Sequence, residues 1–288
     1  MVRKFDTRGW RIVAVLWACC ALGALARAED SPRPSDVTAL DHGFSGLYNL
    51  DFDGAQKDFK TWQELHPDDP VGPVSEAAGW LFSEFNRLGV LEAQFYENDE
   101  AFADRPKLRP DPAVRMRFLA AIGRAENLSR ARLAKDAKDR DALFALTLAS
   151  GLQADYAALI EKRNLASLHY TKEASASAQE LLAVCPDCYD ALLATGFSKY
   201  LIGSMAAPFR WILRLDGLPA DKQGGITDLE TTAEHGHYLA PFARILLAIA
   251  YVREKDKAHA LQLLTDLGRE FPANTLFPRE IAHLQALR

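Results

Sequence analysis

Two cysteines, Cys185 and Cys188, stand close together with Pro186 and Asp187 between them. This is the spacing of thiol–disulfide exchange motifs, in which a helix N-terminus lowers one thiolate pKa. Here the first cysteine ends an expected helix, and the dipole at a helix C-terminus disfavours a thiolate. Tyr189 stands where a c-type haem attachment site needs His. We therefore expect a structural disulfide, with redox exchange and free thiols as the alternatives.

The other motifs indicate no enzyme class. His235 and His237 flank one glycine, but two ligands are too few for a metal site, and no nearby cysteine or carboxylate has a matching spacing. The chain carries no nucleophile elbow, Walker loop, dinucleotide fingerprint or zinc-protease helix. We expect no catalytic residue, no metal and no cofactor, although an enzyme assembled from distant residues stays open.

Two groups of polar and aromatic residues are candidates for binding. The first surrounds one expected helix–helix connection, where Arg163 could hold a carboxylate in a bidentate pair. The second lies in an insertion between two helices, where basic side chains interrupt an apolar segment. The simpler explanations are a polar turn for the first group and a cover over exposed core for the second. The candidates are Tyr156, Arg163 and Tyr170 in the first group, and Arg210, Trp211 and Arg214 in the second.

The elements that must position these residues are helices. Of the 288 residues, 49% are hydrophobic and 25% are charged, which is ordinary globular composition. Alternating runs of Val, Ile and Thr are nearly absent, and the helix formers Ala, Leu, Glu, Lys and Arg dominate after residue 36. We predict an all-α fold. The expected helices are 37–48, 50–67, 74–86 with a continuation through Gly89 to 95 that is either a kink or a break, 112–137, 141–160 with Asp141 as its cap, 165–184, 189–200, 225–234 and 277–287.

The N-terminus is a different kind of segment. Four basic residues precede an apolar run over residues 12–26, and Ala26 and Ala28 supply the small residues that a signal peptidase reads. We expect residues 1–28 to be a secretory signal peptide and 29–36 an extended leader; an uncleaved anchor and a lipoprotein site are the alternatives. Cleavage would remove five basic residues and one acidic residue from totals of 34 and 39, leaving a net charge of −9.

This reading predicts an exported protein of a bacterial periplasm or cell envelope, without a stable membrane span after cleavage. Such an acidic chain repels phosphate backbones, so nucleic acid is not an expected partner.

One stretch organises the remaining sequence. Phe52, Ala55, Phe59 and Trp62 fall on one stripe of a helix, and Pro67 ends it. This arrangement resembles the second helix of a tetratricopeptide repeat, a helix pair that recurs about every 34 residues. Related spacing returns in three units, 37–67, 141–186 and 239–272. The chain also resembles uncharacterised exported bacterial tetratricopeptide proteins.

The resemblance implies a right-handed α-solenoid over residues 37–288, with elongated middle repeats and an insertion over 203–224. It also implies a non-catalytic scaffold that holds a protein or peptide on the concave face of its first helices, where Phe197 and Tyr200 are the expected groove residues. The alternative is a small-molecule-binding protein or an enzyme with a pocket between 161–172 and 203–224. An enclosed pocket would favour that alternative, and an open groove would favour the scaffold.

Overall fold

The computed structural model describes residues 38–91, 107–204 and 220–286, which all belong to one unit of the chain that begins at Thr38. The expected signal peptide and leader lie outside the described residues. So do Arg210, Trp211 and Arg214, the candidate residues of the insertion.

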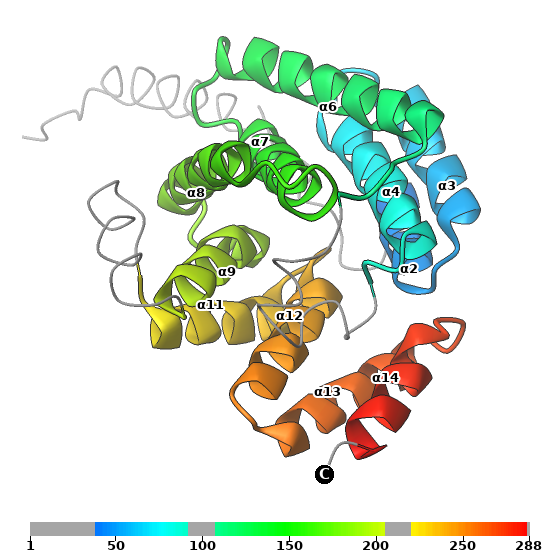
Figure 1. Ribbon diagram of the computed structural model, residues 1–288. Helices are drawn as coiled ribbons and strands as arrows, with labels where there is room; N and C mark the ends of the chain where they lie inside the picture. Colours follow the sequence, from blue (N-terminus) through cyan, green and yellow to red (C-terminus); the bar gives the residue numbers. More distant parts are fainter. Residues whose placement is uncertain (1–37, 92–106, 205–219, 287–288) are drawn as a thin grey trace, which may run out of the picture. The chain divides into compact units, whose positions relative to one another are not determined.

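The prediction of an all-α fold is confirmed, because the described residues form helices and no strands. Figure 1 shows these helices with their labels. They are α2 (Ala39–Tyr48), α3 (Phe52–Leu65), α4 (Val71–Arg87), α6 (Pro112–Leu133), α7 (Arg140–Asp155), α8 (Asn164–Val184), α9 (Leu192–Gly203), α11 (Lys222–His235), α12 (Ala240–Arg253), α13 (Lys257–Glu270) and α14 (Leu276–Ala286), with a π-helical turn at Tyr156–Ile160 and a 3₁₀ turn at Tyr189–Ala191.

The first hairpin follows the sequence pattern closely. Thr38 and Asp41 form a reciprocal capping box at the start of α2, and the Asp51 side chain caps α3. A Cβ atom on Gly43 would overlap the ring of Phe59, which is fully buried. Gly43 therefore lets α2 and α3 approach each other closely enough to bury Phe59 of α3.

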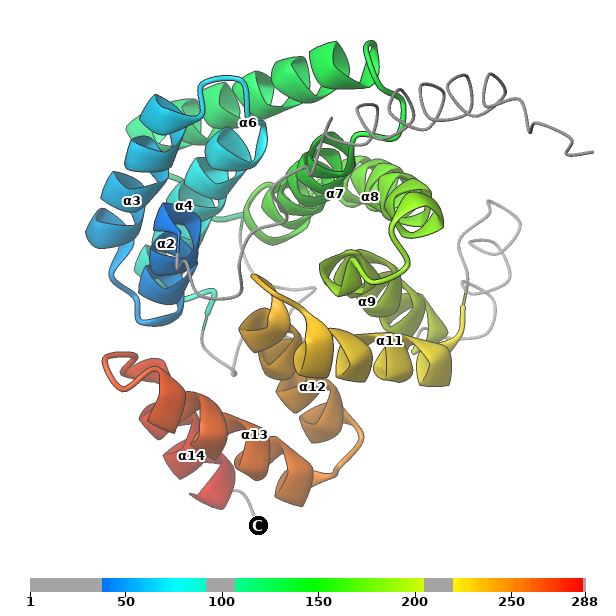
Figure 2. The ribbon, with the colours of Figure 1, turned by 180° about the vertical axis from the view of Figure 1, so that it is seen from behind.

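Successive helices pack against one another as antiparallel pairs (Figures 1 and 2). The pairs are α2 with α3, α4 with α6, α7 with α8, α9 with α11, and α12 with α13, and α14 packs on α13. The first members of these pairs also meet, since α4 contacts both α2 and α7, and α7 contacts α9.

Several predicted helix boundaries were wrong. For the segment after Asn86, the structure shows the break and not the kink, since α4 stops at Arg87 and Gly89 has a positive φ of 71°; α4 begins at Val71 and not at Val74. The Asp139 side chain caps α7 in place of Asp141, which pairs with Arg132 at 3.1 Å. Asp139 and Asp141 are both suitable caps, and the turn geometry decides between them.

The insertion also proved shorter than 203–224. Gly203 ends α9 and residues 222–224 begin α11. A Cβ atom on Gly203 would lie only 2.5 Å from the backbone nitrogen of Lys222. The chain therefore leaves the α9–α11 hairpin and rejoins it at nearly the same point.

Tyr238 lies in the connection between α11 and α12 and joins distant helices. Its ring stacks on Phe44 of α2 with centroids 4.8 Å apart, and it lies 6.2 Å from the ring of Phe144 of α7. The Asp190 carboxylate accepts hydrogen bonds from the backbone N–H groups of Tyr238, at 2.9 Å, and Leu239, at 3.1 Å. These contacts hold the starts of α2, α7 and α12 together.

The segment Arg140–Ile160 is long and apolar enough to cross a membrane by length and composition alone. More than half of its apolar window is buried against other helices of this structure, as is also found in core helices.

Candidate functional site

The first predicted group of binding residues is not brought together. Tyr156 is buried and stacks on Phe118 of α6 with centroids 5.2 Å apart, and burial raises the pKa of its hydroxyl. Arg163 is exposed, and its guanidinium pairs with Glu161 at 3.2 Å. Tyr170 lies on α8, partly exposed beside His169. The simpler explanation, a polar turn over packed core, describes Tyr156 and Arg163 well.

The two expected groove residues have different surroundings. Tyr200 is only 3% exposed and packs between α9 and α12, with its hydroxyl 3.5 Å from the carbonyl oxygen of Ala250. Phe197 is partly exposed and packs at the edge of the same apolar cluster. Phe197 alone therefore offers its ring to a surface.

Phe197 belongs to a larger surface, which we call the inner face. On α7 its residues recur at steps of four, three and four, and on α9 at steps of four, so each set lies on one side of its helix. The first residues of both sets pack against the same apolar cluster, which includes Phe44 and Leu239. The inner face comprises Phe144, Leu148, Gly151 and Asp155 of α7, and Leu193, Phe197 and Leu201 of α9.

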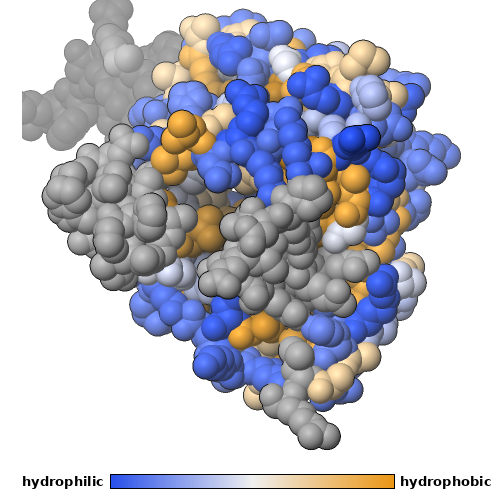
Figure 3. All heavy atoms as spheres, in the orientation of Figure 1, coloured by the Kyte–Doolittle hydropathy of each residue, from blue (hydrophilic) through white to orange (hydrophobic). Residues whose placement is uncertain are grey.

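This face is apolar and partly open. Each of its large apolar residues keeps some exposure, and Leu201 is 40% exposed. A Cβ atom on Gly151 would have no neighbour within 4 Å. Figure 3 shows a hollow with apolar, orange residues over α9. Exposed apolar residues that gather on one surface are typical of a binding site.

Asp155 is the one charged residue of this face, and sequence reasoning missed it. Among the described residues no hydrogen bond or ion pair reaches its carboxylate, and burial raises its pKa from 3.8 to about 7. A π-helical turn follows directly, a distortion that is frequent at functional sites. A signal was present in the sequence, since Asp155 is the only charged residue between Ala142 and Ile160.

A second surface feature lies between α11, α12 and α13. It is a cleft of about 320 Å³, and its lining includes the acidic residues Glu230 and Glu234 together with Leu247. Tyr251 donates a hydrogen bond to Glu230 at 2.9 Å, and burial together with this carboxylate raises the pKa of Tyr251 to about 12. Arg244 pairs with Glu270 at 2.7 Å. Tyr251 and Glu230 thus pair within the cleft, whereas Arg244 pairs with a residue outside it.

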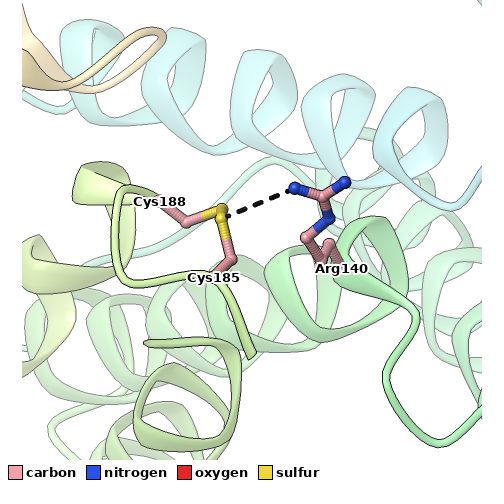
Figure 4. The surroundings of a disulfide bond; sticks show 3 residues. All are labelled: Arg140, Cys185 and Cys188. Atoms are coloured by element: carbon pink, nitrogen blue, oxygen red, sulfur yellow. Dashed lines mark hydrogen bonds between the residues drawn. A yellow bond between two sulfur atoms is a disulfide. The ribbon is translucent and has the colours of Figure 1, made fainter. Parts of the chain in front are cut away.

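Cys185 and Cys188 form a disulfide that joins the end of α8 to the turn before α9. Figure 4 shows Arg140, from the start of α7, pointing toward this bond, with its terminal nitrogen 3.9 Å from the Cys185 sulfur. Cys185 is buried, and Cys188 is partly buried. An attacking thiol needs access to a sulfur, so this position favours a structural link over exchange.

The two histidines considered as metal ligands point to different partners. His237 pairs with Asp41 at 2.7 Å and stacks on Tyr238, whereas His235 lies beside Tyr189. Within residues 38–91, 107–204 and 220–286, no three His, Cys, Asp or Glu side chains are grouped to hold a metal ion.

The alternative prediction is a pocket between residues 161–172 and 203–224. Most of the second of these segments lies outside the described residues. Compared with protein-family models, with curated proteins and with solved structures, the chain matches none of them significantly. The site must therefore be interpreted from its own geometry.

Proposed function

We propose that the protein is a non-catalytic scaffold that binds a protein or peptide, built from tetratricopeptide-like hairpins in a right-handed solenoid and exported to a bacterial cell envelope. The sequential pairing of helices supports this proposal. The close approach of Gly43 to Phe59 also supports it, because this pairing of a small with a large residue is the repeat's packing pattern.

The observation that carries the proposal is the inner face. Phe144, Leu148, Phe197 and Leu201 keep exposed surface on two neighbouring first helices. In helical repeat proteins such a surface forms a continuous groove that takes an extended or helical segment of a partner. The apolar side chains would supply most of the binding free energy, at roughly 25 cal/mol for each Å² that is buried.

Peptide selection tests this proposal. Peptides are selected from a random displayed library on the purified protein, and their affinities are then measured by isothermal titration calorimetry. The test variant is Leu201→Glu, which places a charge on the inner face. The matched control is Met116→Glu on α6, because Met116 is 68% exposed and lies outside the inner face. Circular dichroism and thermal unfolding establish that both variants fold.

We expect Leu201→Glu to weaken the selected peptides about tenfold or more, since a charge in an apolar contact costs at least about 1.4 kcal/mol. Met116→Glu should leave the affinity within about twofold. Equal effects of the two variants would place the peptide elsewhere, and a library that yields no binder would refute the scaffold proposal.

A further inference from the structure

Among the residues that the structure describes, Asp155 stands on the inner face without a counterion. The other inner-face residues of α7 and α9 are Phe, Leu and Gly, so the carboxylate is the single charge on that surface. Arginines of other elements that lie near the C-terminal end of α7 already have acidic partners. Arg115 and Arg163 both pair with Glu161, at 3.5 and 3.2 Å. Arg87 of α4 pairs with Glu84 at 2.6 Å. In the described part of the chain, the neighbouring carboxylates Glu161 and Glu84 thus have arginine partners and Asp155 has none.

Such an arrangement costs stability. A partly buried carboxyl that makes no hydrogen bond loses its hydration without compensation. Because the residue is partly exposed, its carboxylate keeps some of its hydration, and a cationic ligand that pairs with it would replace the hydration that it has lost. Asparagine or alanine at this position would avoid the cost of the charge.

The surroundings of Asp155 also provide room. Gly151 lies one turn earlier on the same side of α7, with nothing within 4 Å of the position of a Cβ atom. Glycine inside a helix costs about 1 kcal/mol relative to alanine, so this helix forgoes stability at that turn too. The π-helical turn at Tyr156–Ile160 begins at the next residue and changes the helix register there. An open glycine position, a carboxylate without a partner among the described residues and a π-helical turn therefore coincide at one place.

We propose that Asp155 binds the cationic side chain of a lysine or arginine in the bound peptide, while the residues that flank this side chain lie on the apolar inner face; this inference rests on the proposed function. A basic side chain fits both parts of the site, because its aliphatic stem packs on apolar surface and its charged end reaches the carboxylate. A divalent cation fits less well, since it needs several oxygen ligands.

The charge of the chain agrees with a basic peptide. Its 39 acidic residues outnumber its 34 basic residues, giving a net charge of −5. A negatively charged protein attracts cationic segments and repels acidic ones during their encounter. Asp155 would then select among the attracted segments by the position of their basic residue.

Two matched peptides test the inference. One is acetyl-Leu-Phe-Lys-Phe-Leu-amide, and the other carries the uncharged residue norleucine in place of the lysine. Their affinities are measured by calorimetry at about pH 8, where a carboxyl with a pKa of about 7 is mostly ionised. The variants are Asp155→Asn, which removes the charge but keeps the shape, and Leu201→Glu. The control is Glu64→Gln on α3, which removes a charge at an exposed site.

We expect Asp155→Asn to weaken the lysine peptide about tenfold or more, because a charge-assisted hydrogen bond is lost. The norleucine peptide should bind Asp155→Asn and the wild type alike, and Glu64→Gln should change neither affinity. If Asp155→Asn leaves the affinity of the lysine peptide unchanged, the inference is wrong.

The two proposals fail in different ways. If both peptides bind equally and Leu201→Glu weakens both, the inner face binds peptides but Asp155 does not select a cation. If neither peptide binds the wild type at about 1 mM, the limit of weak specific binding, the inference is refuted. A displayed library that also yields no peptide would then refute the scaffold.

Discussion

Replacing Asp155 by asparagine should stabilise the protein above neutral pH. The carboxyl group of Asp155 is partly buried and has no hydrogen bond or ion pair among the described residues. Burial therefore raises its pKa from 3.8 to about 7 in the folded protein. Asparagine is uncharged at every pH and nearly the same size, so the variant removes the cost of burying the charge.

The magnitude follows from the shift in pKa. A rise of about three units corresponds to about 4 kcal/mol, at 1.36 kcal/mol for each unit. Water still reaches part of this side chain, so we expect about half of this value, about 2 kcal/mol.

The sign of the pH dependence is determined by proton binding. Between about pH 4 and pH 7 the folded state retains a proton that the unfolded state releases, so wild-type stability falls as the pH rises through this window. The advantage of Asp155→Asn should be absent near pH 4, grow toward pH 7 and stay constant above it.

Thermal unfolding at a series of pH values checks this prediction. For a chain of this size, 2 kcal/mol corresponds to about 4–8 °C in Tm. Glu64→Gln serves as the control, because Glu64 is exposed and its replacement should change Tm by less than about 1–2 °C. A gain that is the same at pH 4 and pH 8, or no gain at pH 8, would refute the assignment of an unpaired, desolvated carboxyl.

Two further predictions concern contacts between helices. Asp190→Ala removes the acceptor of two backbone N–H groups at 2.9 and 3.1 Å, and should lower the free energy of unfolding by about 3 kcal/mol, measured in urea. Gly225→Ala should cost about 1–3 kcal/mol, because its Cβ would overlap the backbone nitrogen of Tyr200 and lie 2.6 Å from the carbonyl oxygen of Gly196, so that α9 and α11 must separate.

Each of these variants has a matched control in the chain. Asp187→Ala removes an exposed carboxylate three residues from Asp190 and should change stability by less than about 0.5 kcal/mol. Gly123→Ala adds a methyl group in α6 where no atom lies within 4 Å, and should stabilise by about 1 kcal/mol. Equal losses within either pair would contradict the proposed contacts.

Much of the fold was predictable because its causes are local. The 3.6-residue period that marks a helix, the cap at Asp51 and the proline after the second helix all lie within a few residues of the structure they determine. The first hairpin was therefore located to within about two residues. The cap of α7 was misplaced from Asp139 to Asp141, because two aspartates nearby satisfy the same rule and only the turn decides between them.

The candidate site was less predictable. Tyr156 and Tyr200 are aromatic residues at helix positions that sequence alone cannot assign to a surface or to the core, and both are buried. Phe197 is partly exposed, and its assignment to a binding groove stays a prediction. Asp155 could have been noticed as the single charge between Ala142 and Ile160, but its lack of a counterion among the described residues becomes visible only when the surrounding helices are placed.

Local chemistry thus determined the helical class, the first hairpin and the position of the paired cysteines. Tertiary packing decided which side of each helix faces its neighbours. It brought Tyr238 against Phe44 and Phe144, which are far from it in the chain, and it supplied Glu161 with arginines while leaving Asp155 without one. The physical reason is that burial and charge pairing depend on distances between segments, and these distances do not exist until the helices pack.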